Sequence, residues 1–312
     1  MPLEVPDRDE WFPKPDTFPR PDWPAIKEWI DASVRKEDLS EAYQQMARYW
    51  LARLLAVLGG TYTVAESDHF HFISALDEKG RTRMLQLLEN ARLRLLHTLG
   101  DVAWTDASGK HVVLRFTDVD NYYAYISHFY EDGEHASTGG VFLRKGYSHI
   151  AYFEQFQMDT ERMILAHELA HNLLAQQPLP TWLNEALAEA FTADLAGGRF
   201  AALDGDLFDQ HQSYWNAETI QEFWMGRSFQ VVEGQRVAYS LAQVLLDVIR
   251  REVRPDPETF RRFIKQASWK DAGEAAALDH LEVGLGEIAS VFLGDGDWSP
   301  KPATWEKHEE KA

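Results

Sequence analysis

Two histidines and two glutamates near the middle of the chain have the spacing of a catalytic metal site. His167 and His171 lie four residues apart in Ala166-His167-Glu168-Leu169-Ala170-His171, and on a helix this spacing directs both imidazoles to one face. Glu185 is the natural third ligand of a zinc ion that keeps its fourth position for water. Glu168 lies roughly 100° around the helix from His167. It can therefore act as the general base on a zinc-bound water that attacks a polarised carbonyl.

The flanking residues predict two helices joined by a short turn. Residues 160–176 carry apolar side chains at helical spacing, and Pro178 and Pro180 then favour a turn. Thr181 is in place to cap a second helix, which carries the third ligand. Such a pair of helices can bring the three ligands together. The alternative is that the histidines are ordinary half-buried residues and the glutamate a solvated helix carboxylate.

At these residues the chain resembles the gluzincin zinc metallopeptidases. Their His-Glu-x-x-His motif is followed on the next helix by a Glu ligand in an Asn-Glu-Ala or Asn-Glu-Gly setting, which Asn184-Glu185-Ala186 matches. The resemblance implies that Glu168 is the general base and acid, and that one zinc ion per chain is bound by His167, His171 and Glu185. The spacer between the second histidine and the third ligand is shorter than in the best-known gluzincins, which favours the smaller peptidase MA-like family.

The same resemblance implies roles for residues around the ligands. Glu189, together with Asn184, would support the ligands from outside, since a metal-bound imidazole needs an acceptor on its other N–H. Glu189 can also be read as a solvated helix residue. Tyr239 matches a tyrosine that hydrogen-bonds the oxyanion, whereas a tyrosine on an amphipathic helix can equally be a core residue. His211 is a less favoured substitute for Tyr239.

Two short strands are predicted just before the metal helix. Residues 138–143 and His149–Phe153 alternate as strands around a turn at Lys145-Gly146-Tyr147. In gluzincins the corresponding edge strand binds the substrate, which makes Gly139, Gly140 and Val141 candidate substrate-binding residues. The glycines could instead form a bulge or turn. Aminopeptidases of this group carry a Glu on the strand, and its absence here argues against aminopeptidase activity.

Composition restricts the partners and the setting. The chain has 312 residues, a net charge of −19 and no cysteine, so disulfides and Cys-ligated zinc are excluded. Its acidity disfavours nucleic acid, and no transmembrane or secretory segment is apparent, so we expect no membrane partner. The expected location is the cytoplasm, unless a signal has already been removed. The expected partner is a peptide or protein substrate, and the oligomeric state stays open.

The order of predicted elements favours an α+β fold of the zincin-like type. A small mixed sheet would back the metal helix, followed by an all-helical C-terminal half and preceded by a helical extension. Residues 11–24 alternate aromatics with prolines, and we expect this arm to pack on the body, although it could bind a partner. The predicted regions are an arm with helical extension at 1–58, a mixed subdomain at 59–178, a helical subdomain at 179–300 and a tail at 301–312.

Further elements are predicted upstream of the metal helix. His69 and His71 share one face of a strand, so a second metal site is conceivable there, but no third ligand is apparent nearby. Helices are predicted at 25–35, 40–58, 77–99 and 118–130, and strands at 61–65, 69–73 and 111–116.

The sequence as a whole predicts a zinc metallopeptidase. Two alternatives remain: a zincin-like module that binds a partner without peptidase activity, and a metal-dependent hydrolase of a non-peptide amide or ester. The intact Glu168 argues against loss of activity, because replacing the base is the simplest way to inactivate such a site.

Overall fold

The computed structural model describes all residues except 1–2, 14–17, 106–108, 131–137, 197–204 and 306–312. The chain divides into two units, one formed by Met1–Leu96 with Trp104–Leu173 and the other by His97–Ala103 with Leu174–Ala312. The N-terminal helices pack on the sheet of the first unit. The predicted division into an arm, two subdomains and a tail stays a prediction.

The first unit is built on a mixed sheet of five strands in the order β1-β2-β3-β5-β4. The parallel strands β2, β3 and β5 form its centre, and β1 and β4 pair antiparallel at the two edges. All residues of β2 and β3 are buried, as expected for inner strands covered on both faces. The strands are β1 (Thr63–Glu66), β2 (Phe70–Ser74), β3 (His111–Phe116), β4 (Gly140–Leu143) and β5 (His149–Phe153).

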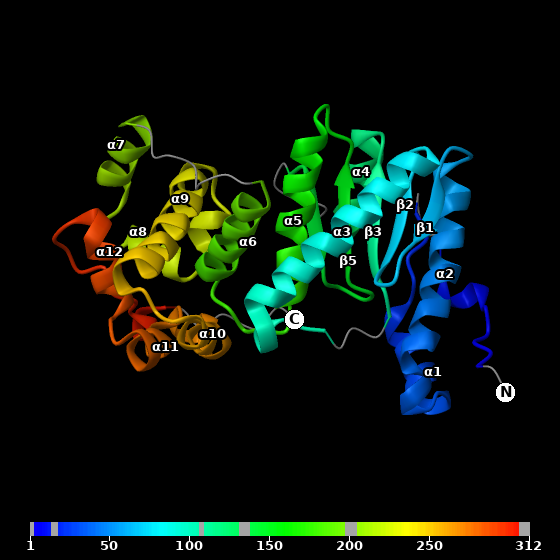
Figure 1. Cartoon of the computed structure of the whole chain (residues 1–312), viewed down its shortest axis with the longest axis horizontal. Helices are drawn as coiled ribbons and strands as arrows, with labels where there is room; N and C mark the ends of the chain where they lie inside the picture. Colours follow the sequence, from blue (N-terminus) through cyan, green and yellow to red (C-terminus); the bar gives the residue numbers. More distant parts are fainter. Residues whose placement is uncertain (1–2, 14–17, 106–108, 131–137, 197–204, 306–312) are drawn as a thin grey trace. The chain divides into compact units, whose positions relative to one another are not determined.

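Five helices accompany this sheet, and α3 runs across the strands in Figure 1. One hydrophobic cluster joins side chains of α1, α2 and α4 to Ile73, Val112 and Leu114 of the strands. Because side chains alternate along a strand, Arg115 points to the opposite face, where it binds a residue of α5. The helices are α1 (Trp23–Ser33), α2 (Leu39–Leu58), α3 (Glu78–Leu99), α4 (Val119–Ile126) and α5 (Met158–Leu174).

The aromatic arm packs on the first unit, as the sequence predicts. Trp11, Phe12 and Phe18 are buried members of the core cluster, and the guanidinium of Arg53 lies 4.3 Å from the centre of the Phe12 ring. Residues 14–17 of the arm lie outside the described residues. Helix α1 begins earlier than expected because the carboxylate of Asp22 accepts a hydrogen bond from the first turn.

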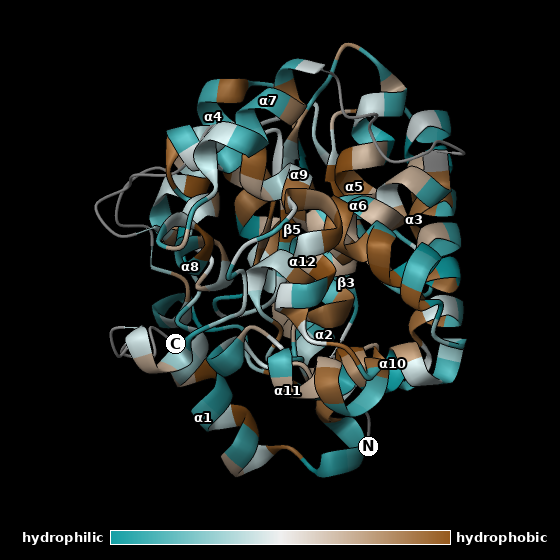
Figure 2. Cartoon of the chain, turned by 90° about the vertical axis from the view of Figure 1, so that its left-hand side faces the viewer, coloured by the Kyte–Doolittle hydropathy of each residue, from teal (hydrophilic) through white to brown (hydrophobic). Residues whose placement is uncertain are grey.

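The described residues that follow α5 are helical and contain no strand, in agreement with the predicted all-helical half. Helix α6 packs on α9, whose apolar side is buried. Helix α10 carries both hydrophobic and hydrophilic residues (Figure 2). These helices are α6 (Thr181–Ala196), α7 (Gly205–Tyr214), α8 (Thr219–Trp224), α9 (Val232–Val248), α10 (Pro257–Gln266), α11 (Glu274–Ala276) and α12 (Leu285–Leu293).

The predicted tail differs from the structure in its first residues. Gln221 Oε1 on α8 accepts hydrogen bonds from Lys301 N at 2.8 Å and from Trp305 Nε1 at 3.0 Å. The folded body therefore extends to residue 305, and residues 306–312 lie outside the described part. Among the described helices, none has the length and apolar character needed to cross a membrane.

Candidate metal centre

The N-terminal half of α5 is fixed to the sheet by a buried ion pair. Glu161 on α5 accepts hydrogen bonds from Arg115 Nε at 3.0 Å and from Arg115 Nη2 at 2.8 Å, and both side chains are 5% exposed. Burial works to lower the pKa of Arg115, but the bonds to Glu161 raise it above its ordinary value. Gln155 N and Tyr152 Oη also donate to the same carboxylate. This pair, which no pattern in the sequence predicts, orients the helix that carries both histidines.

A second contact brings the same helix close to the sheet edge. At Gly140 an added Cβ would lie 2.4 Å from Cγ2 of Ile164 and 3.1 Å from Cβ of Tyr152. At Gly139 it would lie 3.0 Å from Cδ1 of Ile164. Ile164 precedes His167 by one helical turn. The absence of a side chain at both glycines therefore allows Ile164 of α5 to approach this edge of the sheet closely. Gly139 lies in the bend that precedes β4, and the substrate-binding role of these residues stays a prediction.

Helix α6, which carries Glu185, is fixed at its first turn within the second unit. The Trp182 side chain is fully buried, and its Nε1 donates to the carbonyl of Ala272 at 2.9 Å. Gly226 has a φ of +82°, and a Cβ there would lie 2.4 Å from Oγ1 of Thr181. A left-handed residue without a side chain is therefore required beside Thr181, the first residue of the helix.

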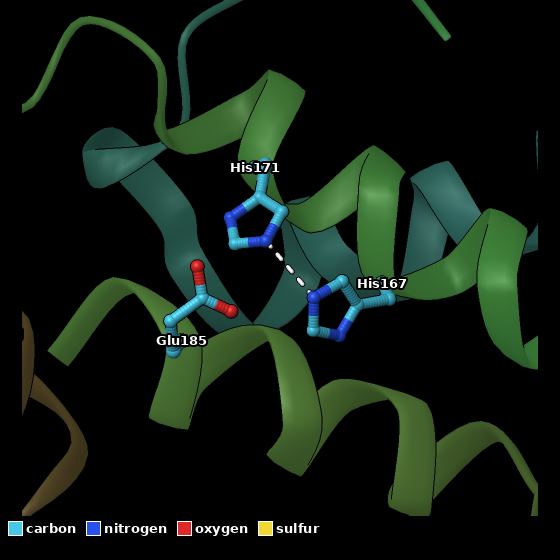
Figure 3. Close-up of side chains that lie close together, drawn as sticks. All are labelled: His167, His171 and Glu185. Atoms are coloured by element: carbon cyan, nitrogen blue, oxygen red, sulfur yellow. Dashed lines mark hydrogen bonds between the residues drawn. The ribbon is translucent and has the colours of Figure 1, made fainter. Parts of the chain in front are cut away.

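The three predicted ligands lie together (Figure 3). His167, His171 and Glu185 each offer a ligand atom, and these atoms all lie within 4.8 Å of one another. The two Nε2 atoms of the histidines are 3.0 Å apart. Ligand atoms about 2.0–2.1 Å from a tetrahedral zinc ion lie roughly 3.3 Å from each other. The histidine nitrogens are thus already close to the separation that zinc requires, and all three side chains are half-buried.

The predicted general base lies in a shielded position on the same helix. Glu168 is 8% exposed, and its negative charge acts on the phenols of Tyr122 and Tyr130. Burial raises the pKa of Tyr122 and of Tyr130 above the ordinary value, and the negative charge of Glu168 raises both further by a smaller amount. Both phenols therefore stay protonated near neutral pH. The sequence shows only a tyrosine-rich helix here, and this pattern alone does not reveal the proximity.

The remaining predicted residues lie on two helices of the second unit. Asn184 and Glu189 are half-buried residues of α6 beside and one turn after the third ligand, and their supporting role stays a prediction. Tyr239 lies on α9, which packs on α6, and its half-buried ring meets Phe229 edge-on at 5.2 Å. Its role at the oxyanion also stays a prediction.

His211 is held in the core by hydrogen bonds at both ring nitrogens. Its Nδ1 accepts from Trp215 Nε1 at 2.8 Å, so Nε2 carries the proton and donates to Ser240 Oγ at 2.9 Å. Burial lowers the pKa of His211 to about 4. A neutral imidazole with both nitrogens engaged is a structural residue, which removes it as a substitute for Tyr239.

The predicted substrate residues lie at the edge of the sheet, because β4 pairs with β5 alone among the described strands. Phe153 N donates to Gly139 O at 3.3 Å, so these two residues form a hydrogen-bonded pair. Because such pairs alternate along an antiparallel ladder, the backbone N–H and C=O of Val141 point toward β5. Those of Gly140 and Phe142 point away from β5. The hydroxyl of Thr138 donates to Gly140 O and accepts from Gly140 N. The outer edge therefore presents the backbone of Phe142, while Val141 faces β5.

His69, which lies just before β2 and not within the strand as predicted, does not form a second metal site with His71 of β2. His69 Nδ1 lies 2.9 Å from Glu89 Oε2, whereas His71 Nδ1 lies 3.4 Å from Glu66 Oε1, so each has its own carboxylate. Burial lowers the pKa of His71 to about 4, which keeps it neutral. Within the described residues, the one group of three or more side chains placed to hold a metal is the ligand set on α5 and α6.

No family model matches the chain, and a search of curated proteins finds no match. The donor set and its surroundings are therefore the basis on which a function can be assigned.

Proposed function

We propose that the chain is a zinc-dependent metallopeptidase with a zincin-like fold, of the gluzincin class and similar to the peptidase MA-like family. The observation that carries the proposal is the group of ligand atoms from His167, His171 and Glu185 within 4.8 Å of one another. Two imidazoles and one carboxylate are a common protein ligand set of hydrolytic zinc sites, which leave the fourth position open. The shielded Glu168 beside them supplies the base that such hydrolysis needs.

Each residue then has a defined task. A bound zinc ion would supply a Lewis acid that polarises a peptide carbonyl and acidifies water. Glu168 accepts the proton of the attacking water and returns it to the leaving amine. Its low exposure limits exchange of that proton with bulk solvent. In this proposal an extended substrate pairs with the edge strand that carries Gly139, Gly140 and Val141, through the outward N–H and C=O of Phe142. Tyr239 is assigned to the oxyanion.

The test is cleavage of a peptide library by wild type and by Glu168→Gln, with zinc measured in the same samples. We expect about one zinc ion per chain in both proteins, and at least a 100-fold slower cleavage by the variant, since general bases contribute roughly 10²–10⁴-fold. Asp159→Asn is the matched control. Its carboxylate also lies on α5, but it is 86% exposed, so its loss should leave cleavage unchanged.

Two outcomes would contradict the proposal. Zinc bound in stoichiometric amount without cleavage of any peptide would favour a partner-binding module, or a hydrolase of a non-peptide amide or ester if such substrates are turned over. Absence of bound zinc after addition of the metal to folded wild type would remove the metal site itself.

A further inference from the structure

The outer edge of β4 offers few backbone groups to an extended peptide. In an antiparallel pair every second residue directs its N–H and C=O away from the partner strand. On β4 these residues are Gly140 and Phe142, because Val141 and Leu143 face β5. A peptide that joins the edge of a sheet binds through such outward groups. The number of groups that stay available therefore limits how β4 can bind a substrate.

The hydroxyl of Thr138 occupies both outward groups of Gly140. It donates to Gly140 O and accepts from Gly140 N at 3.4 Å. A peptide residue could pair with Gly140 only by displacing this hydroxyl. Such a residue would exchange one set of hydrogen bonds for another, so its net contribution to binding would be small.

Helix α4 restrains Thr138 from the other side. Tyr123 Oη donates to Thr138 O at 3.4 Å, so the carbonyl of this residue is also engaged. The hydroxyl of Thr138 lies near the buried phenol of Tyr122 as well. Burial raises the pKa of that phenol, and the nearby hydroxyl lowers it by a smaller amount. These contacts keep the Thr138 side chain at the edge of the sheet and close the edge upstream of Gly140.

Phe142 is left with backbone groups that a peptide can use. No hydrogen bond to its N–H or C=O is present among the described residues. Leu143 is the last residue of β4, and the chain then turns at Gly146, which has a φ of +80°. The usable edge is therefore bounded by Thr138 on one side and by this turn on the other.

We propose that Thr138 determines substrate specificity by restricting backbone pairing to Phe142 alone. This inference rests on the proposed peptidase function. In either direction of the added strand, one substrate N–H donates to Phe142 O, so proline is excluded at that position because it has no N–H. The N–H two residues away, which would face Gly140, is not needed. The substrate class is thus a peptide that requires one free N–H for pairing and accepts proline two residues from it.

The test is an N-methyl scan of the library peptide that wild type cleaves fastest. Each N–H outside the cleaved bond is methylated in turn, and KM and kcat are measured with the zinc-loaded full chain. In wild type, methylation of one pairing N–H should raise KM by about tenfold. Thr138→Val removes the hydroxyl and frees both groups of Gly140. It should lower KM for the unmodified peptide by about fivefold or more, with little change in kcat, and make a second N–H two residues away sensitive.

Two further variants separate the hydroxyl from other effects. Thr138→Ser keeps a hydroxyl and should restore the pattern of one sensitive N–H. Thr82→Val removes an exposed hydroxyl that donates to Glu78 O on α3, so KM and the scan should match those of wild type. Amide hydrogen exchange, measured by NMR without peptide, should be faster at Gly140 in Thr138→Val than in wild type.

The outcomes distinguish this inference from the proposed function. A wild type that cleaves no peptide would overturn the peptidase function, and the role of Thr138 with it. Cleavage with the same scan in wild type and in Thr138→Val, or equal exchange at Gly140 in both proteins, would overturn the role of Thr138 and leave the peptidase function in place.

Discussion

Substitution of Gly140 by alanine tests whether close approach of α5 to β4 positions the metal helix. The new Cβ would lie 2.4 Å from Ile164 Cγ2, whereas ordinary contacts begin at 3.4 Å. Ile164 is β-branched and lies within a helix, where its χ1 is restricted, so a rotamer change cannot easily relieve the contact. The helix or the strand must therefore shift. Overpacking of this kind costs about 1–3 kcal/mol, and replacing a strand glycine returns roughly 0.5–1 kcal/mol.

The expected net loss is roughly 1–2 kcal/mol of the free energy of unfolding. With an m-value of about 3 kcal/mol/M, since m rises with chain length, the urea midpoint should fall by about 0.3–0.7 M. Because His167 follows Ile164 by one turn, zinc affinity should fall as well, by about tenfold for each 1.4 kcal/mol of misplacement. Urea unfolding followed by circular dichroism and a zinc titration of the folded protein measure both effects.

Two further variants test whether the contact between residue 140 and Ile164 causes the loss of stability. Gly60→Ala adds a Cβ with no neighbouring atom within 4 Å, so its stability should equal or slightly exceed that of wild type. In Gly140→Ala/Ile164→Ala the crowded methyl group is gone, and the double variant should be more stable than the sum of the single changes predicts. Additive losses, or a Gly140→Ala protein as stable as Gly60→Ala, would refute the proposed contact.

Two other predictions concern buried ionisable groups. Arg115→Met should cost about 3–5 kcal/mol by leaving Glu161 charged and buried, whereas Arg115→Met/Glu161→Met should recover most of it; equal losses in denaturant unfolding would contradict this. Burial lowers the pKa of His149 to about 4, below the value near 6.5 of the unfolded chain. The stability that depends on a neutral His149 is therefore fully present above pH 6.5 and is lost as the pH falls toward 4. At pH 5 the free energy of unfolding should be lower by about 2 kcal/mol. His149→Phe should be less stable at pH 7 but lose less stability between pH 7 and 5, and an unchanged pH dependence would refute the assignment.

The elements with the clearest local signals were predicted most closely. The strands at 111–116 and 149–153 are apolar runs with sharp ends, and the structure has them at the predicted residues. Pro178 and Pro180 end the helical pattern of α5 and separate it from α6, and the grouping of His167, His171 and Glu185 followed from this turn.

Contacts between residues far apart in the sequence could not be predicted in this way. The ion pair between Arg115 and Glu161 joins a strand to a helix 46 positions later, and no periodicity relates the two. The need for glycine at 140 depends on a methyl group of α5, which no pattern in the strand reveals.

The outer edge of β4 also bears on self-association. An open strand edge can pair with another chain and start the growth of an aggregated sheet. At β4 the hydroxyl of Thr138 hydrogen-bonds both the C=O and the N–H of Gly140. The other outward-pointing backbone groups of the described strand are the N–H and C=O of Phe142. This edge can hold one residue of an extended chain. It is too short to sustain the continuous pairing that fibre growth requires.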